Sequence, residues 1–438
     1  MVFDSSGNIF ASTVTDINND AGAIVELSPA DGGAWNEKLV YAFDRYSTSF
    51  SGWHPQGTLV IDSKGNLYGT TQYGGGMFNT NTNTYPCGGS SGCGTVFELS
   101  KNADGVWTAT DLYNFGVDNT NDGFQPVAGV TLASTAATEL YGTAKCGGTS
   151  KATLADCAGA GTIYELSKTK SGSWQETILY NFPATGTSEG PGIENDPNGA
   201  FPTAGLLLKN GNLYGTTSGG GINANGDAGV GVLFEFSPES GGGTMNQLYV
   251  FCTTNTAHDS CPEGGYLGPG TVTMDSEGNL YGTTGGVFDI DATNLGQPST
   301  VWELPYSSDT KSYANRVQVL YSQYQFPSPG PVGQWVVPYK NSLFTLGFSG
   351  TGGSWPYYSC CGELIELTNS AKSGWQATPV YQFPPSGVDP SYTTLYGFGN
   401  QMIVDRNGTF YSMSQYGGPS AAGGNLGYGG VLEISPLP

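Results

Sequence analysis

Residues 278–284, which read GNLYGTT, decide the fold because this phrase returns along the whole chain. Residues 65–71 and 211–217 repeat it letter for letter, and weaker copies occur at 7–13 (GNIFAST), 139–144 (ELYGTA), 341–347 (NSLFTLG) and 407–413 (NGTFYSM). The copies are 58 to 73 residues apart, measured between the hydrophobic residues Ile9, Leu67, Leu140, Leu213, Leu280, Leu343 and Phe410. A nearly fixed period of this size indicates a repeat architecture.

Each repeat contains four strand-like segments. In the second repeat they are residues 57–62 (GTLVID), 67–71 (LYGTT), 94–100 (GTVFELS) and 112–115 (LYNF), separated by turn-forming residues. Alternating hydrophobic runs between turns are typical of antiparallel strands. We therefore predict an all-β, seven-bladed β-propeller with four-stranded antiparallel blades. A β-solenoid is the alternative, although its repeats are usually shorter.

We expect the propeller to be a single domain spanning residues 1–438. The predicted blades are 1–52, 53–125, 126–201, 202–266, 267–330, 331–395 and 396–438. The seventh copy supplies three strands, at 401–404, 409–412 and 431–434, and no outer one. We expect an upstream segment resembling LYxF to complete that blade. We expect a monomer unless the exposed edge of this blade pairs with another chain.

Composition excludes several kinds of partner. The chain has 438 residues and a net charge of −22, with only 14 Lys and Arg. Nucleic acid and anionic membranes both require clustered cations, so neither is an expected partner. The sequence contains no run of 18 apolar residues, so no membrane span is predicted.

The phrase pair GNLYGTT and GTVFELS resembles the GloVer tandem repeat of bacterial proteins, and the resemblance covers nearly the whole chain. It implies an exported bacterial propeller, secreted or at the cell surface, and no particular activity. Members of that family commonly carry a variable surface-anchoring tail.

The eight cysteines lie in four close pairs within glycine-rich loops: Cys87 with Cys93, Cys146 with Cys157, Cys252 with Cys261, and Cys360 with Cys361. An even number of paired cysteines indicates disulfides and an oxidising compartment. Zinc is the alternative, but the two histidines lack the usual Cys/His ligand spacing.

A residue that recurs in every blade is architectural, because seven copies cannot all be one active site. This applies to the glutamate of the third strand, for which we expect a hydrogen bond between blades. Function is expected on the side that carries the long loops, between the second and third strands and between successive blades. The single-copy candidates there for acid–base catalysis are His54, His258, Asp259 and Asp122.

The same side carries candidate ligand-binding aromatic residues. Residues 355–361 read WPYYSCC and would form a rigid platform with Trp355, Tyr357, Tyr358, Cys360 and Cys361, while Trp53 adds a second aromatic face beside His54. Alternating oxygen side chains, the arrangement that calcium loops use, occur twice: Asp16, Asn18 and Asp20, and Asn223, Asn225 and Asp227. Ca²⁺ is therefore the candidate cofactor, although neither stretch completes an EF-hand loop.

These patterns favour a secreted protein that binds a carbohydrate or similar extracellular polymer on its long-loop face. A polysaccharide lyase or glycoside hydrolase that uses the histidines and nearby carboxylates is the alternative. A structural or adhesive surface protein is a third hypothesis, because fold alone does not decide function.

The cysteine spacing gives a direct test. Mass spectrometry of non-reduced peptides should find the pairs 87–93, 146–157, 252–261 and 360–361. Reduction should loosen the loops before it unfolds the blades, because short disulfide loops contribute less stability than long ones. Eight free thiols in freshly exported protein would contradict this prediction.

Overall fold

A computed structural model describes the chain in ranges separated by gaps: residues 1–13, 21–46, 52–75, 87, 91–116, 122–149, 153–154, 157–183, 197–223, 229–253, 261–264, 266–268, 270–285, 299–323, 335–348, 362–382, 396–416 and 430–435. These residues are almost entirely strands, turns and loops, with one 3-10 turn, η1 (Asp31–Gly33). They form two compact units, Met1–Gln247 and Leu248–Pro438, and each is described by itself.

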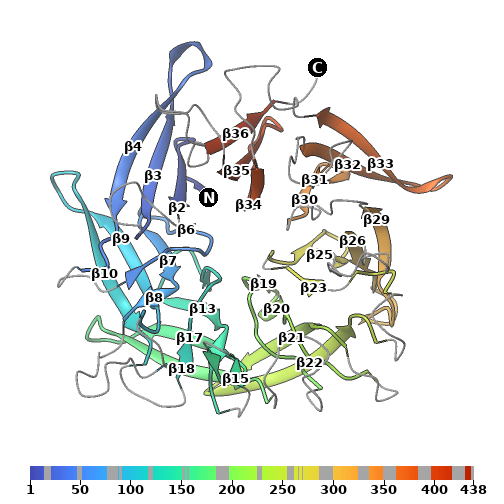
Figure 1. Ribbon diagram of the computed structural model, residues 1–438, viewed down its shortest axis with the longest axis horizontal. Coiled ribbons are helices and arrows are strands. Elements are labelled where there is room, and N and C mark those ends of the chain that lie inside the picture. Colours follow the sequence, from blue (N-terminus) through green and yellow to red (C-terminus); the bar gives the residue numbers. More distant parts are fainter. Residues whose placement is uncertain are drawn as a thin grey trace, which may run out of the picture. The chain divides into compact units, whose positions relative to one another are not determined.

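The first unit holds blades one to three and most of blade four (Figure 1). In each blade the four strands pair antiparallel in chain order. Blade one has β1 (Val2–Phe3), β2 (Ile9–Thr13), β3 (Ala23–Pro29) and β4 (Trp35–Ala42). Blade two has β6 (Val60–Ile61), β7 (Leu67–Thr71), β9 (Thr95–Lys101) and β10 (Trp107–Asn114). Blade three has β12 (Thr131–Leu132), β13 (Glu139–Ala144), β17 (Thr162–Lys168) and β18 (Trp174–Asn181), and blade four has β19 (Leu207–Lys209), β20 (Asn212–Thr216), β21 (Val232–Glu239) and β22 (Gly242–Val250).

The second unit holds the end of β22 and blades five to seven. Blade five has β24 (Thr273–Met274), β25 (Leu280–Gly285), β26 (Ser299–Leu304) and β29 (Gln318–Gln323), with β23 (Tyr266–Leu267) added to β25. Blade six has β30 (Val337–Tyr339), β31 (Ser342–Phe348), β32 (Gly362–Ser370) and β33 (Gly374–Gln382). Blade seven has β34 (Tyr396–Val404), β35 (Phe410–Tyr416) and β36 (Gly430–Ile434), three strands in the part of the chain that is described.

Four short two-stranded sheets accompany the blades. They are β5 (Gly52–Trp53) with β8 (Tyr73–Gly74), β11 (Gly123–Phe124) with β14 (Cys146–Gly147), β15 (Thr153–Leu154) with β16 (Cys157–Ala158), and β27 (Tyr306–Ser307) with β28 (Ser312–Tyr313). Seven successive antiparallel sheets confirm the predicted all-β, seven-bladed propeller fold. Within the described ranges, no helix has the length and apolar character that crossing a membrane requires.

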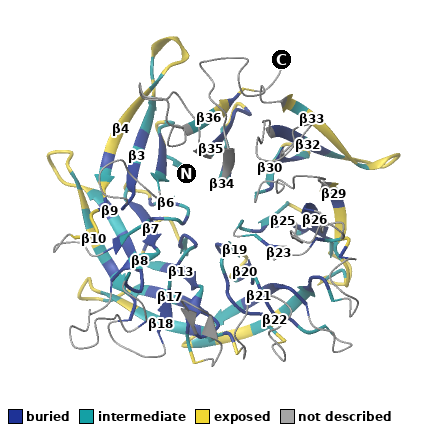
Figure 2. Cartoon of the chain, in the orientation of Figure 1, coloured by how far each residue is buried: buried dark blue, intermediate teal, exposed yellow. Residues whose placement is uncertain are grey.

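Burial follows the order of strands in a blade. The second and third strands are buried, whereas fourth strands such as β4 and β33 carry exposed residues on their outer side (Figure 2). The GNLYGTT and GTVFELS phrases therefore form the core of each blade, which explains why these two phrases vary least along the chain.

The glycine of the LYGT phrase makes room for an aromatic ring on the neighbouring strand. Gly69 lies opposite Phe97 in the β7–β9 pair, and the same cross-strand pairing joins Gly142 to Tyr164, Gly215 to Phe234 and Gly282 to Trp302. At each of these glycines an added Cβ would overlap the ring. The blades without this glycine also lack the ring: Ala11 lies opposite Val25, Thr345 opposite Ile365 and Ser412 opposite Leu432.

The same rings join one blade to the next. Phe43, at the end of the outer segment of blade one, packs edge-to-face on Phe97 of blade two at 5.4 Å between centroids. Phe115 packs edge-to-face on Tyr164 at 5.2 Å, and Phe182 packs on Phe234 at 5.9 Å with the ring planes inclined at 59°. In the second unit Phe251 packs on Trp302 at 5.3 Å. The phenylalanine of the fourth-strand motif is therefore a contact between blades.

Aspartates form the turns between first and second strands. Asp62 Oδ1 accepts hydrogen bonds from the backbone N–H groups of Lys64 and Asn66, and Asp275 Oδ1 does the same for Glu277 and Asn279. This is the usual way in which Asp stabilises a tight turn.

The recurring glutamate of the third strand makes a different contact from the one expected. Glu98 accepts a hydrogen bond from Tyr68 of its own blade at 3.1 Å, so the prediction of a bond between blades is wrong at this position. Glu303 makes both kinds, accepting from Tyr281 in its own blade at 3.1 Å and from Trp375 Nε1 of the next blade at 3.2 Å. The tyrosine of the LYGT phrase ends beside the glutamate because the two residues lie opposite each other in the sheet.

The glycine–ring pairing predicts the effect of one methyl group. Gly69→Ala should lower the stability of the protein by about 1–3 kcal/mol, because the new Cβ overlaps the Phe97 ring. Gly242→Ala is the matched control, since its Cβ would lie 3.9 Å from the nearest atom, and its effect should stay within about 0.5 kcal/mol.

The double variant Gly69→Ala/Phe97→Leu separates this contact from other effects. Its loss, measured by thermal or denaturant unfolding, should be smaller than the sum of the two single losses. Strictly additive losses would contradict a direct clash between the two positions.

Candidate functional site

The candidate site is the group of Trp53, His54, Gln56, Gln72 and Tyr73, called the Trp53 cluster below. It lies where β5 pairs antiparallel with β8, so that Trp53 lies opposite Tyr73. Because β8 begins just after β7 ends, the cluster is on the side of blade two from which the long loop between the second and third strands leaves. This is the side on which the sequence predicts function.

Close packing fixes the position of β5. Gly52 lies against the hydroxyl groups of Thr71 and Thr95, which are hydrogen-bonded to each other at 2.8 Å. An added Cβ at Gly52 would meet these hydroxyl oxygens at 2.6 and 2.5 Å, so only glycine lets β5 approach the ends of β7 and β9 this closely.

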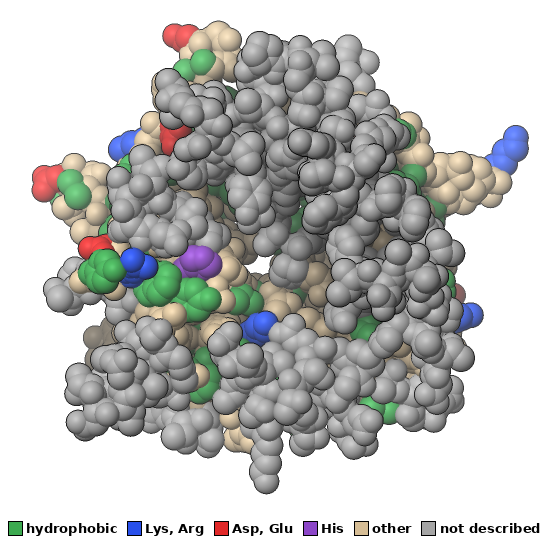
Figure 3. All heavy atoms as spheres, in the orientation of Figure 1, with side chains coloured by type: hydrophobic (Ala, Val, Ile, Leu, Met, Phe, Trp, Pro, Cys, Tyr) green, Lys and Arg blue, Asp and Glu red, His purple; other side chains and the backbone are tan. Residues whose placement is uncertain are grey.

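Three rings gather in the cluster. The Trp53 and Tyr73 centroids are 4.7 Å apart with planes inclined at 40°, and the His54 ring lies 5.2 Å from Tyr73 and 6.0 Å from Trp53. All three side chains are half-buried, so each ring is supported by its neighbours and still partly exposed. In the space-filling view, histidine and hydrophobic side chains lie side by side on one face of the protein (Figure 3).

Polar groups complete the cluster. Gln56 Nε2 donates to Gln72 Oε1 at 2.8 Å, and His54 Nδ1 lies 3.1 Å from the same oxygen. Gln56 Nε2 also lies 3.3 Å from His54 Nδ1, so whether this ring nitrogen donates or accepts depends on the tautomer of the ring. The cluster thus combines aromatic faces with amide and imidazole groups that can both donate and accept hydrogen bonds.

The backbone of His54 has an architectural role that its side chain does not share. His54 has φ 66° and is followed by Pro55. Its N–H donates to Ala21 O of blade one at 2.7 Å, and its carbonyl accepts from Gln72 N at 3.0 Å. Gln125 and Phe201 repeat the positive φ, the following proline and both bonds in blades three and four. The conformation therefore joins consecutive blades, while the side chain at this position differs in each.

Asp122 lies in a buried network next to Tyr113 and Glu176. It is 1% exposed, and its Oδ2 accepts hydrogen bonds from Gly116 N at 2.8 Å and from Tyr113 OH at 3.1 Å. Tyr113 OH also lies 2.8 Å from Glu176 Oε2 in the next blade. Burial, above all, raises the pKa of Asp122 and that of Tyr113. One phenol hydrogen cannot serve two carboxylates, so the network retains an additional proton when both bonds form.

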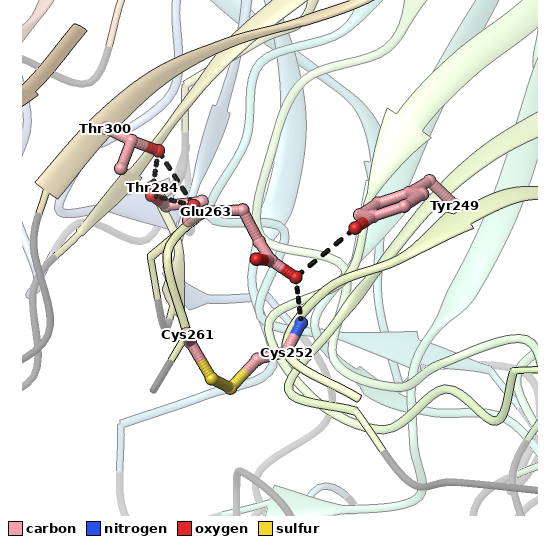
Figure 4. The surroundings of a disulfide bond; sticks show 6 residues. All are labelled: Tyr249, Cys252, Cys261, Glu263, Thr284 and Thr300. Carbon is pink, nitrogen blue, oxygen red and sulfur yellow. Dashed lines mark hydrogen bonds between the residues drawn. A yellow bond between two sulfur atoms is a disulfide. The ribbon is translucent and has the colours of Figure 1, made fainter. Parts of the chain in front are cut away.

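The cysteine pairs 87–93 and 252–261 are disulfide-bonded, as predicted, and Cys146 is also in a disulfide. Cys146 lies in β14 and Cys157 lies in β16. A backbone bridge between Gly147 and Gly159 brings these two segments together. Figure 4 shows the second pair: Glu263 Oε1 accepts from Cys252 N and from Tyr249 OH, each at 3.2 Å. The Glu263 carbonyl accepts from the hydroxyl groups of Thr284 and Thr300, both at 2.8 Å, so this disulfide loop is tied to blade five.

Several predicted site residues lie outside the described residues. These are His258 and Asp259, Trp355, Tyr357, Tyr358, Cys360 and Cys361 of the predicted platform, and Asp16, Asn18, Asp20, Asn225 and Asp227 of the calcium loops. Asn223 is described and half-buried. In the ranges with assigned positions, no group of three or more His, Cys, Asp or Glu side chains could hold a metal ion. The calcium sites and the catalytic role of Asp122 stay predictions.

Sequence reasoning identified Trp53 and His54 but missed Gln56, Gln72 and Tyr73. One signal could have found two of them. The two residues directly after the phrase LYGTT or LYGTA differ between blades. They are Gln72 and Tyr73 in blade two, Lys145 and Cys146 in blade three, and Ser218 and Gly219 in blade four. Variation immediately after an invariant phrase marks positions where the scaffold does not dictate the side chain.

No protein-family profile matches this chain, and no curated protein sequence matches it. Among solved structures, it is similar to an ulvan lyase of polysaccharide lyase family PL25, bound to a saccharide of GlcA and Rha3S units. The TM-score is 0.53 at 11% identity, over 99% of this chain and 90% of that one. A second structure of that lyase gives a TM-score of 0.51 with the same identity and coverage.

A sucrose-6-phosphate hydrolase from Lactobacillus gasseri gives a TM-score of 0.35 at 9% identity, over 98% of this chain and 76% of that one. At such low identities the lyase shows a shared fold and no more, and the hydrolase match is too weak to support an argument.

The buried network predicts a pH dependence. Because the pKa of Asp122 is raised in the folded protein, its contribution to stability is present below the unfolded pKa of about 3.9 and is lost as pH rises through the folded pKa. Asp122→Asn cannot titrate, so its melting temperature should improve relative to wild type as pH rises above the unfolded pKa of about 3.9. Asp104→Asn, at an exposed position, should follow wild type. A difference between Asp122→Asn and wild type that does not change with pH would contradict the assignment.

Proposed function

We propose that this protein binds a carbohydrate or similar extracellular polymer at the Trp53 cluster. The observation that carries the proposal is the pair of half-buried rings, Trp53 and Tyr73, set 4.7 Å apart beside the bonded side chains of His54, Gln56 and Gln72. A sugar ring has an apolar face and a rim of hydroxyl groups. An aromatic surface covers the first, and groups that both donate and accept hydrogen bonds pair with the second.

The arrangement of the side chains in the cluster favours ligand binding over a purely structural role. A buried core would enclose the rings completely and leave the amides out, whereas these rings remain partly exposed and the amides are already oriented by one another. Preorganised side chains lose less conformational entropy on binding, which favours affinity.

Two further observations agree with an extracellular polymer. The disulfides Cys87–Cys93 and Cys252–Cys261 fit an oxidising compartment outside the cytoplasm. The ulvan lyase that shares this fold is named for its action on a polysaccharide, which agrees with the proposal but does not carry it. The bacterial origin implied by the GloVer resemblance belongs to the same proposal.

A lyase or glycoside hydrolase is the second candidate function. It is favoured by one contact, the His54 ring 5.2 Å from Tyr73, which brings together two groups that can transfer protons. Hydrolysis of a glycosidic bond by the usual route requires two carboxyl groups. The His54 ring contacts the side chains of Gln72 and Gln56. We place binding first because the partly exposed ring pair and the oriented amides account for recognition of a sugar without a catalytic step.

The test is a glycan array followed by calorimetric titration with the strongest polysaccharide ligand. Trp53→Ala should weaken binding about 10- to 100-fold, because truncating an aromatic anchor typically costs 2 kcal/mol or more. Trp174→Ala is the matched control. Trp174 begins β18 at the turn between third and fourth strands, on the opposite side of its blade, and its loss should leave affinity unchanged.

The same samples decide between binding and catalysis. Incubation with the ligand should release no new reducing ends and no unsaturated sugar, which absorbs ultraviolet light. Release that disappears in His54→Ala would establish the enzyme instead. Equal affinity in wild type and Trp53→Ala would refute this site as the place of binding.

A further inference from the structure

The first residue after the phrase LYGTT or LYGTA occupies an equivalent place in three successive blades. Gln72 N donates to the carbonyl of His54 at 3.0 Å, Lys145 N to that of Gln125 at 3.2 Å, and Ser218 N to that of Phe201 at 3.0 Å. Each therefore lies beside the left-handed residue of its own blade. Because the same backbone hydrogen bond forms in each blade, the three positions are equivalent and carry different side chains.

Packing places these positions one after another. An added Cβ at Gly94 would lie 3.1 Å from the carbonyl oxygen of Gln72 and 2.4 Å from Pro126, which follows Gln125. At Gly161 the equivalent atom would lie 2.8 Å from the carbonyl oxygen of Lys145 and 2.5 Å from Pro202. The Trp53 cluster, the Gln125–Lys145 pair and the Phe201–Ser218 pair thus form consecutive positions on the same side of blades two, three and four.

Lys145 differs from the other cations of the protein. It is half-buried, whereas every other Lys or Arg in the described ranges is exposed: Lys38, Arg45, Lys64, Lys101, Lys168, Lys170, Lys209, Lys311, Arg316, Lys340, Lys372 and Arg406. The whole chain has only 14 Lys and Arg against 36 Asp and Glu. Its place is also the one that in blade two holds Gln72, whose side chain bonds to the imidazole of the Trp53 cluster.

We propose that the polymer bound by this protein is acidic, and that the Lys145 ammonium group binds a carboxylate or sulfate of the saccharide unit next to the one on the Trp53 cluster. This inference rests on the proposed function and specifies its ligand class. A lysine ammonium is a compact charge with three donors, suited to a single carboxylate or sulfate group. A hydrogen bond to a charged group contributes more free energy than one between neutral groups.

The net charge of −22 does not prevent this contact. Repulsion between exposed charges is screened over about 8 Å at physiological ionic strength, whereas a direct pair at a half-buried lysine is screened much less. The acidic surface should therefore slow the approach of an anionic polymer more than it weakens the bound state.

Two matched pairs of polymers test the proposal. Polygalacturonate is compared with its carboxyl-reduced neutral form, and dextran sulfate with dextran, so that carboxylate and sulfate recognition are distinguished. Calorimetric titration or affinity electrophoresis of the full chain gives each affinity. One acidic polymer should bind at least about tenfold more tightly than its neutral partner.

Variants then assign the preference to one side chain. Lys145→Gln should lower the affinity for the acidic polymer to that for its neutral partner and leave the neutral affinity unchanged. Lys145→Arg should keep most of the acidic preference. Lys209→Gln, an exposed lysine at the end of β19, is the control and should match wild type. Melting temperatures of all variants exclude a general loss of folding.

The outcomes separate this inference from the proposed function. Binding of neutral polymers only, or an acidic preference that survives in Lys145→Gln, overturns the role of Lys145 and leaves carbohydrate binding at the Trp53 cluster in place. No binding of any glycan by wild-type protein overturns both.

Discussion

The rest of this structure depends on one steric constraint, the fit of a third-strand aromatic ring over a second-strand glycine. Phe97 covers Gly69 within its blade and receives Phe43 from the blade before it. One ring therefore decides both the packing inside a blade and the contact between two blades. Where the ring is replaced by an aliphatic side chain, as at Val25 and Ile365, the facing position also changes, to Ala11 and Thr345. The two facing residues therefore change together: glycine faces an aromatic ring, and a larger residue faces an aliphatic side chain.

This constraint separates scaffold from site. Facing residues of the second and third strands are constrained by each other, whereas the residues immediately after the second strand vary more freely, because the contacts there are made by the backbone. His54, Gln125 and Phe201 hold the same left-handed conformation and the same pair of backbone bonds with three unrelated side chains. A propeller blade of this type can thus present different chemistry at one place without altering its fold.

Much of this organisation could be predicted from the sequence. The phrase GNLYGTT and its partner phrases predicted the strands, turn-forming residues separated one strand from the next, and the cysteine spacing predicted the two described disulfides. These features are local, so they are readable from neighbouring residues. Trp53 and His54 were identified as single-copy residues on the long-loop side for the same reason.

Other features could not be read in this way, because they depend on contacts between distant segments. The role of Gly69 requires knowledge of the register that sets it opposite Phe97. Tyr73 and Gln72 join Trp53 and His54 only through the pairing of β5 with β8, which no local pattern predicts. The glutamate of the third strand was expected to bond between blades, but at Glu98 its partner is the facing tyrosine of its own blade.

Hydrogen–deuterium exchange with and without a bound polysaccharide tests most directly the central claim that a fixed scaffold presents a saccharide site at the variable positions after the LYGT phrase. Ligand should slow amide exchange in peptides that cover residues 52–56 and 72–75, and also 124–126 and 145–147, while the second and third strands exchange slowly in both states. Protection confined to the opposite side of the blades, at the turns between first and second strands, would contradict the account.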